Sequence, residues 1–226
     1  MTVIIPAANE AGNIGRLVQE ILETVLVKVI VVDNASTDAT AQEAAKAGAN
    51  VVSEPQRGYG HACAAGVADA KDADILVFLD GDYSFSPADI PSLLAPILDG
   101  RADLVLGSRE LGQIAEGAMY PQQRFGNWLA SRLMNFLYGL SITDLGPYRA
   151  IRAGLLRELH MQETTYGWPT EMIVKAARRK ARIVEVPVSY RSRLSGRSKV
   201  SGTIRGTLLA GWYILGVTFR YAWRIR

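Results

Sequence analysis

The sequence has 226 residues, of which 49% are hydrophobic and 21% are charged. This length and composition are typical of one sizeable globular domain with a real core. The single cysteine, Cys63, excludes an internal disulfide framework and any zinc site built from several cysteines. The chain enters an apolar segment directly after Met1, so we expect no secretory signal and a cytoplasmic location.

The net charge of +3 hides an uneven distribution. Eight of the 25 basic residues lie from Val188 onward, where there is no acidic residue. The preceding chain therefore carries the other 17 basic residues against all 22 acidic ones, a net charge of −5. An acidic body followed by a basic segment indicates an anionic partner for that segment: a phosphate, a nucleic acid or a membrane surface.

Strand and helix patterns alternate through the first half of the chain. Strands are predicted over residues 2–6, 28–33, 50–54, 74–80 and 102–108, and helices over 13–24, 38–48, 59–71 and 87–98. Repeated strand–helix units predict an α/β fold, with a mostly parallel sheet and helices on both faces. The second half predicts helices over 122–138 and 170–179 and a strand over 182–190, without a clear interdomain linker.

Polar residues follow several of these strands. They occupy positions 6–10, 33–36, 80–82 and 107–109. Because ligands of parallel α/β sheets bind beyond the carboxyl ends of the strands, we expect all of these segments to meet at one binding edge.

Asp80 and Asp82 end an apolar strand and are separated only by Gly81. Carboxylates two positions apart leave a strand end on the same side and repel each other, so a cation is expected between them. A divalent ion with hard oxygen ligands fits, and an incoming phosphate would complete its coordination. The alternative is that Asp80 caps a turn and Asp82 is solvated, which the gathering of polar segments at one edge disfavours.

Two further strand ends carry candidate ligands. Asp33 could accept hydrogen bonds from a base or ribose, or it could be a turn acid. Arg109 could bind a phosphate through its forked guanidinium, or it could form a surface ion pair. Residues 190–202 interleave cations with Gly and Ser, a composition suited to gripping phosphate.

Other site types are not supported. The sequence has no Walker-type phosphate loop, and the Gly58–Gly60 pair lacks the third glycine of a dinucleotide fingerprint. It has only two histidines, no HExxH motif and no Gly-x-Ser-x-Gly elbow, which excludes a histidine-rich zinc site and disfavours a serine hydrolase.

The chain resembles the family 2 glycosyltransferases, and among them the polyprenyl-phosphate sugar transferases of the dolichyl-phosphate mannose and glucose synthase group. The resemblance spans residues 2–202 and is carried by IPAANEAGNI, VIVVDNASTDAT, PQRGYGHACAAG, VFLDGDYSFSP, ADLVLGSR, TDLGPYRAIR and EVPVSYRSRLSGRSK. It implies a GT-A fold over residues 1–202, a UDP- or GDP-sugar donor, and Mg²⁺ or Mn²⁺ held by Asp80 and Asp82. It also implies transfer of a hexose with inversion to a polyprenyl phosphate.

The resemblance also implies roles for individual residues. The expected donor contacts are Pro6, Asn9, Glu10, Asp33, Asp80, Gly81 and Asp82. Asp144 is expected near the sugar, so that Asp82, Asp144 and Arg109 form the catalytic set. The expected ligands of the acceptor phosphate are Arg109, Arg124, Arg191, Arg193, Ser198 and Lys199.

The sequence departs from the family pattern at Ala8, where an aromatic residue is usual, and at Asn34, which replaces an acid. The identities of the donor base and sugar therefore stay open. The Gln-x-x-Arg-Trp signature of polymer synthases is missing, which argues against a processive enzyme.

The segment 206–219 contains no charged residue and is rich in aromatic and aliphatic side chains. Spanning a bilayer takes about 20 apolar residues, so this stretch is too short. We therefore expect an interfacial helix within 203–226 that holds the enzyme peripherally on the cytoplasmic face of a membrane, since arginines bracket the apolar stretch. The alternative is a helix packed on the domain or in a homodimer interface.

An apolar tail of this kind disfavours nucleic acid as a partner. The alternative to a lipid-linked acceptor is a soluble family 2 transferase that acts on a non-lipid acceptor.

Overall fold

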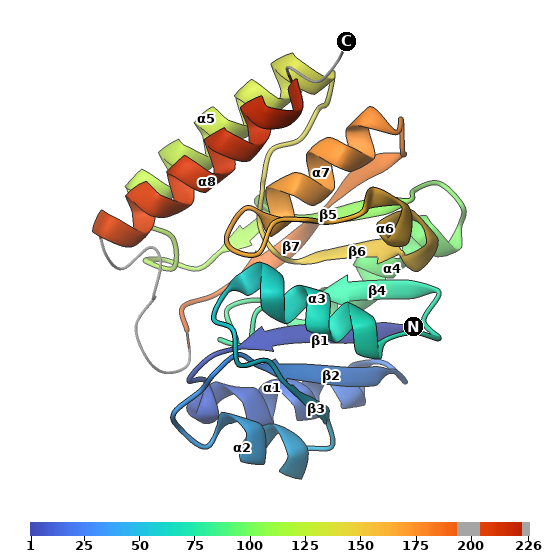
Figure 1. Ribbon diagram of the computed structural model, residues 1–226, viewed down its shortest axis with the longest axis vertical. Coiled ribbons are helices and arrows are strands. Elements are labelled where there is room, and N and C mark those ends of the chain that lie inside the picture. The colour runs from blue at the N-terminus through green and yellow to red at the C-terminus, as the bar shows by residue number, and fades with distance from the viewer. Residues whose placement is uncertain (194–203, 223–226) are drawn as a thin grey trace.

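The computed structural model describes residues 1–193 and 204–222, which form a layered α/β structure (Figure 1). Seven strands form one sheet in the order β3-β2-β1-β4-β6-β5-β7. The strands are β1 (Thr2–Ala7), β2 (Lys28–Asp33), β3 (Asn50–Ser53), β4 (Ile75–Phe78), β5 (Leu104–Ile114), β6 (Arg149–Arg152) and β7 (Ile183–Tyr190).

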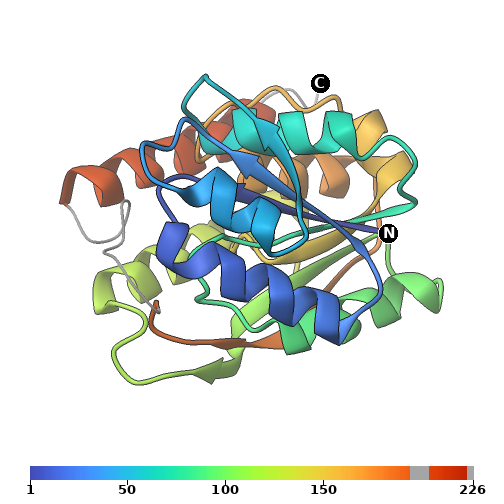
Figure 2. The same cartoon turned by 90° about the horizontal axis from the view of Figure 1, so that it is seen from below.

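Helices cover both faces of this sheet (Figure 2). They are α1 (Ala11–Thr24), α2 (Thr40–Lys46), α3 (Tyr59–Asp69), α4 (Ile90–Leu98, after the 3₁₀ turn Pro87–Asp89), α5 (Pro121–Tyr138), α6 (Ala153–Leu159), α7 (Trp168–Arg178) and α8 (Ile204–Ala222). Helices α1, α2 and α4 share one core cluster with the sheet, whereas α3 and α5 to α8 share the other. The predicted α/β class and the helices on both faces are confirmed.

Alternating side chains on the central strands build these two cores. On β1, Val3 and Ile5 pack toward α1 and α4, while Ile4 packs toward the opposite cluster. Strand β4 continues the alternation with Val77 on the first face and Phe78 on the second. Since all of these side chains are buried, the strands read as continuous apolar runs in the sequence.

Strand β6 was not predicted, and neither was helix α6. β6 lies between β4 and β5 and is antiparallel to both, so the sheet is mixed, while every other pairing is parallel. The sequence of β6 begins and ends with arginine, so it does not look like a buried strand. Arg149 is nevertheless almost fully buried. Since β6 alone runs backwards, the carboxyl ends of the other six strands still meet at one edge, as the sequence predicts.

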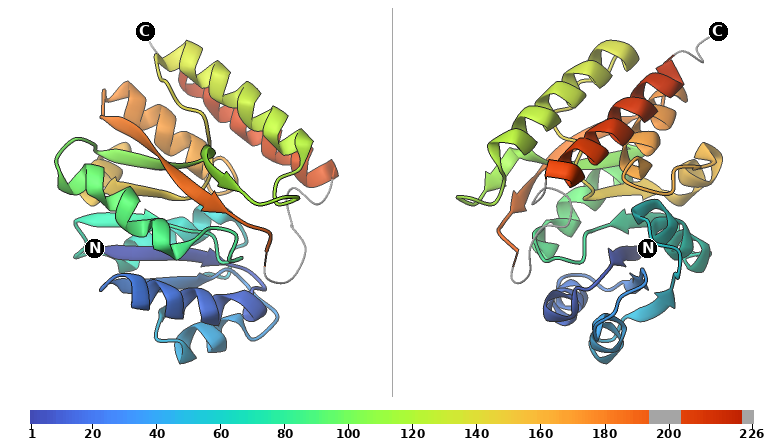
Figure 3. Two further views of the ribbon diagram at one scale, coloured as in Figure 1. Left: turned by 180° about the vertical axis from the view of Figure 1, so that it is seen from behind. Right: turned by 60° about the vertical axis from the view of Figure 1, so that its left-hand side comes forward.

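Helix α8 lies beside α5 and α7 along one margin of the molecule (Figure 3). It buries Val217, Thr218 and Tyr221, while Trp212 is 77% exposed. The alternative of packing on the domain is therefore met on one side of this helix, and the expected contact with a membrane remains a prediction for the other side. No helix within residues 1–193 and 204–222 combines the length and apolarity that crossing a bilayer requires.

Candidate functional site

A cavity of about 420 Å³ opens at the carboxyl edge of the sheet. Six segments meet there: the ends of β1, β2 and β7, the start of α3, the turn after β4, and the loop before α7. The lining residues are Pro6, Ala7, Ala8, Glu10, Asn34, Arg57, Gly58, Tyr59, Ala62, Asp80, Gly81, Asp82, Thr165, Tyr166 and Arg193. We call this space the donor cavity. It contains most of the residues that the sequence assigns to the donor and the metal.

Asp80 and Asp82 lie together in the donor cavity, as predicted. Asp82 is only 4% exposed, so the alternative of a solvated Asp82 is wrong. Its Oδ1 accepts hydrogen bonds from the backbone N–H and the hydroxyl of Ser84, at 3.0 and 2.6 Å. Burial, followed by repulsion from Asp82, raises the pKa of Asp80 to about 7. Burial and the neighbouring carboxylate both disfavour the bare Asp80 anion, and a cation bound between the two acids would relieve both effects.

The two carboxylates fit a divalent ion that is shared with a substrate. Within the described parts of the chain, no group of three or more His, Cys, Asp or Glu side chains could hold a metal by itself. Mg²⁺ in phosphate-handling sites is bound through one or two carboxylates plus substrate phosphates and water. The pair therefore suits an ion that arrives with, or is completed by, a diphosphate.

A buried arginine and two buried weak acids lie near Asp80. Arg149 acts on Tyr59, Cys63 and Asp80 electrostatically, and burial lowers the pKa of Arg149 to about 10. Burial raises the pKa of both the Tyr59 hydroxyl and the Cys63 thiol. The Arg149 guanidinium donates to the backbone carbonyls of Leu145, Gly146, Pro147 and Pro169. It thus ties the segment after Asp144 to the start of α7 and places positive charge near the acid pair.

The predicted nucleotide-contacting residues divide into two groups. Pro6 and Glu10 line the donor cavity, whereas Asn9 and Asp33 do not. The Oδ1 of Asn9 accepts a hydrogen bond from the backbone N–H of Thr37 at 2.7 Å, which joins two neighbouring loops. Asp33 accepts one from the N–H of Ser36 at 3.3 Å, so it serves as a turn acid here.

The cavity-lining residues that had no site role assigned from the sequence include Arg57, Tyr59, Thr165 and Tyr166. The position of Arg57 after the third predicted strand was a usable signal, because that strand ends at the same edge. Thr165 and Tyr166 had no such signal, since only the folded chain brings their loop to the cavity.

Asn34 has a structural role that explains its departure from the family pattern. Its side-chain amide donates to the carbonyls of Glu54 and Gln56 at 3.1 and 2.7 Å, and its Oδ1 accepts from the N–H of Gly58 at 2.8 Å. An aspartate here could not donate these two hydrogen bonds. Asn34 thereby holds the loop that leads into α3 against the cavity.

Arg109 and Asp144 form a bidentate ion pair. The Nε–Oδ2 and Nη2–Oδ1 distances are both 2.7 Å, and the backbone N–H of Arg109 donates to Oδ2 as well. Both side chains are largely buried, so the alternative of a surface ion pair is wrong. Burial alone would raise the pKa of Asp144, but the adjacent Arg109 charge outweighs it and lowers that pKa. Asp144 is therefore an anion committed to orienting Arg109.

Glu185 of β7 supports this pair. Its carboxylate accepts hydrogen bonds from the backbone N–H groups of Thr143 and Asp144, at 2.8 to 3.0 Å. The turn that carries Asp144 is thus fixed from the sheet beneath it.

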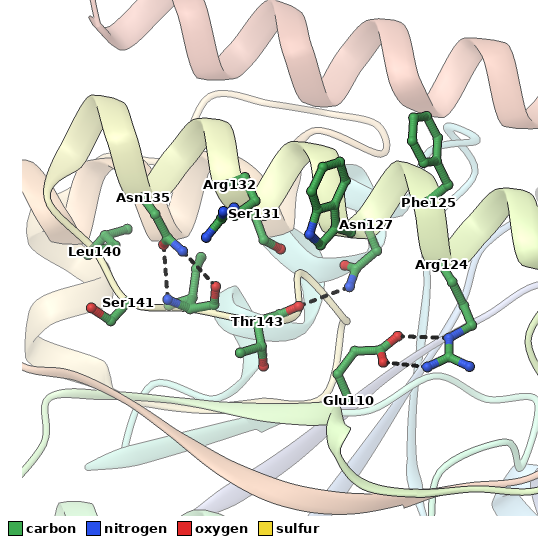
Figure 4. Close-up of a pocket in the computed structure, with 12 residues that line it drawn as sticks. Glu110, Arg124, Phe125, Asn127, Ser131, Arg132, Asn135, Leu140, Ser141 and Thr143 are labelled. Atoms are coloured by element: carbon green, nitrogen blue, oxygen red, sulfur yellow. Dashed lines mark hydrogen bonds and ion pairs between the residues drawn. The ribbon is translucent and has the colours of Figure 1, made fainter.

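A second cavity, of about 840 Å³, lies between α5 and residues 140–143 (Figure 4). We call it the α5 groove. Its lining includes Glu110 and Thr143, the chain neighbours of Arg109 and Asp144, together with Phe125 and Trp128 of α5. Arg124 points from α5 toward Glu110 and forms a paired contact with its carboxylate, at 2.9 and 3.3 Å (Figure 4). Its side chain is 58% exposed and can exchange this partner for another anion at little cost.

The other predicted phosphate ligands do not gather in the α5 groove. Arg193 lies in the donor cavity, with its Nη2 2.6 Å from Oδ2 of Asp82. Arg191 donates to the Ser86 hydroxyl at 2.7 Å. Ser198 and Lys199 lie outside the described residues.

The sequence of the chain matches a known enzyme family over most of the region that forms the site. Residues 2–160 match the model of the family described as "Glycosyl transferase family 2". The chain belongs to glycosyltransferase family 2. It is thus a glycosyltransferase, and the acids of the donor cavity lie within the matched region.

Family 2 relatives match nearly the whole chain. An uncharacterized glycosyltransferase of Mycobacterium tuberculosis is 38% identical over 93% of this chain and 94% of its own length. An undecaprenyl-phosphate mannosyltransferase of Micrococcus luteus is 34% identical over 96% of this chain and 94% of its own. A dolichyl-phosphate hexose transferase of Haloferax volcanii is 34% identical over 88% and 86%.

Solved structures confirm the GT-A fold of this family 2 chain. Glucosyl-3-phosphoglycerate synthase of Mycobacterium tuberculosis, in complex with Mn²⁺, UDP and phosphoglyceric acid, matches with a TM-score of 0.77. The sequences are 24% identical, and the match covers 98% of this chain and 78% of the other. Another structure of that synthase contains Mg²⁺ and UDP, with a TM-score of 0.75.

Proposed function

We propose that this glycosyltransferase moves a hexose from a nucleotide sugar to a polyprenyl phosphate at a membrane surface, with Mg²⁺ or Mn²⁺ as cofactor. The observation that carries the proposal is the position of the Arg109–Asp144 ion pair, whose chain neighbours Glu110 and Thr143 line the α5 groove. The whole-length similarity to an undecaprenyl-phosphate mannosyltransferase supports the same acceptor class.

The donor cavity suits a nucleoside diphosphate sugar. Asp80 and Asp82 would hold the divalent ion, and the ion would stabilise the negative charge that develops on the leaving nucleoside diphosphate. Arg57 and Arg193 line the same cavity and supply positive charge for the phosphates. Pro6 and Asn34 form the wall at the ends of β1 and β2, where the nucleoside is expected.

The α5 groove suits a phosphate attached to an apolar chain. Arg124 lines the groove and Arg109 lies beside it, so both can supply positive charge to a phosphate. Most of the exposed lining is apolar. Phe125 and Trp128 stack near each other with ring centroids 5.9 Å apart. An isoprenoid next to its phosphate would find both a charge partner and an apolar surface here.

Transfer would proceed by direct displacement at the anomeric carbon with inversion. A lipid phosphate is already anionic near neutral pH, so its oxygen needs positioning more than deprotonation. This agrees with Asp144, which is engaged by Arg109 and therefore orients a phosphate-binding cation instead of abstracting a proton. The phosphate oxygen forms the new glycosidic bond as the bond to the nucleoside diphosphate breaks.

The membrane role is assigned to the margin formed by α5 and α8 (Figure 3). Large apolar side chains are exposed there, namely Phe125, Trp128, Leu129 and Phe136 on α5, and Leu209, Trp212, Leu215 and Phe219 on α8. Interfacial helices bury such side chains among lipid headgroups and acyl chains. In this proposal residues 1–202 form the catalytic domain. Residues 203–226 form a segment that packs on this domain and attaches it to the membrane.

The proposal is tested by transfer assays with UDP- and GDP-hexoses, with and without EDTA. Polyprenyl phosphate in vesicles is compared with a water-soluble phosphate acceptor. We expect metal-dependent transfer to the lipid acceptor, and loss of donor binding in Asp82→Ala. Transfer to the soluble acceptor alone would instead support a non-lipid family 2 enzyme, and donor binding unaffected by EDTA would remove the metal assignment.

A further inference from the structure

The loop between α6 and α7, residues 160–167, forms one wall of the donor cavity through Thr165 and Tyr166. The fully buried Glu171 of α7 holds the loop. Its carboxylate accepts hydrogen bonds from the backbone N–H groups of Gln162 and Glu163, at 2.8 to 3.1 Å. The same carboxylate accepts the Tyr221 hydroxyl of α8 at 2.8 Å. The loop is therefore positioned from two helices before any ligand binds.

The loop also lies directly against the N-terminus of α3. The N–H of His61 donates to the carbonyl of Thr164 at 3.1 Å. A Cβ atom added at Gly58 or Gly60 would come within 2.3 Å of a carbonyl oxygen of this loop. Only glycine permits this approach, so the position of Thr165 relative to the cavity is set by close backbone packing.

The Thr165 hydroxyl is left without a partner by this arrangement. Its Oγ1 is buried and has no hydrogen-bond partner in the part of the chain that the structure describes. A buried, unsatisfied hydroxyl is unfavourable, and each such group in a native structure calls for an explanation. Thr165 lines the same cavity as Asp80 and Asp82, and a rotation about its χ1 angle would turn the hydroxyl toward a ligand bound there.

We infer that Thr165 is a donor-binding residue whose hydroxyl hydrogen-bonds the nucleotide sugar in the donor cavity. This inference rests on the proposed function, because it takes the ligand of the cavity to be a nucleotide sugar. Phosphate oxygens and sugar hydroxyls both pair with a threonine hydroxyl, which can donate and accept. Glu171 acts as a positioning residue, since it holds the loop and not the ligand.

The test is Thr165→Val, which replaces the hydroxyl by a methyl group of similar shape. Donor affinity is measured by titration calorimetry with the UDP- or GDP-sugar that the wild type binds, and also with the matching nucleoside diphosphate. Loss of one hydrogen bond should weaken binding about three- to tenfold. The melting temperature of the free protein should not fall, because the hydroxyl that is removed has no partner in the free protein.

Two matched variants complete the experiment. Thr165→Ser keeps the hydroxyl and should restore most of the donor affinity. Thr164→Val changes the exposed neighbouring side chain and should bind like the wild type. Weakening with both ligands assigns the contact to the nucleoside diphosphate, and weakening with the nucleotide sugar alone assigns it to the hexose.

Undiminished donor affinity in Thr165→Val, or an equal loss in Thr165→Ser, overturns the inference while the proposed function stands. A wild-type protein that binds no nucleotide sugar overturns both.

Discussion

Arg193 forms an ion pair with Asp82, with 2.6 Å between Nη2 and Oδ2. Its Nη1 lies 3.6 Å from Oε1 of Glu10, so the guanidinium lies between acids of two different loops. Asp82, one of the two predicted metal ligands, thus already has a positively charged partner in Arg193. A divalent ion that takes both Asp80 and Asp82 as ligands has to compete with Arg193, which can then turn to the donor phosphates.

Arg193→Ala should therefore bind Mn²⁺ more tightly than the wild type when no nucleotide is present. Removing a partly exposed ion-pair partner should raise the affinity about two- to fivefold. Titration calorimetry with Mn²⁺ alone measures the effect. Arg191→Ala is the matched control, because Arg191 pairs with Glu20 and Ser86 and not with the metal acids. Weaker Mn²⁺ binding in Arg193→Ala would mean that Arg193 supports the metal site.

Arg124→Ala should raise the Michaelis constant for polyprenyl phosphate about tenfold or more, since it removes a charge-assisted hydrogen bond to the phosphate. Donor affinity and melting temperature should stay near the wild-type values, because the Arg124 side chain is 58% exposed and exposed ion pairs such as the one with Glu110 contribute little to stability. Steady-state kinetics with each substrate varied in turn separates the two constants. A loss of donor affinity would move Arg124 to the donor side.

Arg109→Ala should behave differently and destabilise the protein. Asp144 is fully buried, and removing its partner leaves an uncompensated charge at a cost of about 3–5 kcal/mol. For a chain of this size the melting temperature should fall by roughly 10 °C. Thermal unfolding of Arg109→Ala and Arg124→Ala side by side measures the contrast. If both variants melted like the wild type, the Arg109–Asp144 pair would not contribute to stability.

The two sides of α8 should respond to mutation in opposite ways. Trp212→Ala removes a side chain that is 77% exposed and should reduce binding to anionic vesicles without lowering the melting temperature. Val217→Ala removes atoms from a side chain that is 1% exposed and should lower the melting temperature while leaving vesicle binding intact. Vesicle co-sedimentation and thermal unfolding test both. Unchanged vesicle binding in Trp212→Ala would argue against a membrane role for the exposed side.

Asp103 should contribute to stability in a pH-dependent manner. Hydrogen bonds from Arg182 lower the pKa of Asp103 to about 2, below its value near 3.9 in the unfolded chain. A lowered folded-state pKa stabilises the fold above about pH 4, and this contribution disappears as the pH falls toward about 2. Asp103→Asn should therefore lower the melting temperature at neutral pH, with a deficit that shrinks as the pH falls from about 4 to about 2. Asp99→Asn, which removes an acid from an exposed ion pair with Arg101, is the matched control.

Local sequence patterns determined the alternation of strands and helices and the edge at which the site lies. Strands buried on both faces appear as short apolar runs, and in a parallel sheet their carboxyl ends meet whatever the details of packing. Asp80 and Asp82 could therefore be placed at the donor cavity from the sequence, together with Pro6 and Glu10. The resemblance to family 2 extended that reading to Asp144 and to the fold.

Only the tertiary structure decided the pairing of those residues with distant segments. Arg109 and Asp144 are 35 positions apart, and they meet because the unpredicted strand β6 lies antiparallel between β4 and β5. The buried Arg149 concealed that strand, since its charge is compensated by carbonyl groups that only the folded chain assembles. Thr165 reaches the donor cavity because Glu171 and α8 hold its loop there. Contacts between residues that are far apart in the sequence form only when the chain folds. The local pattern of apolar and polar residues therefore does not predict them.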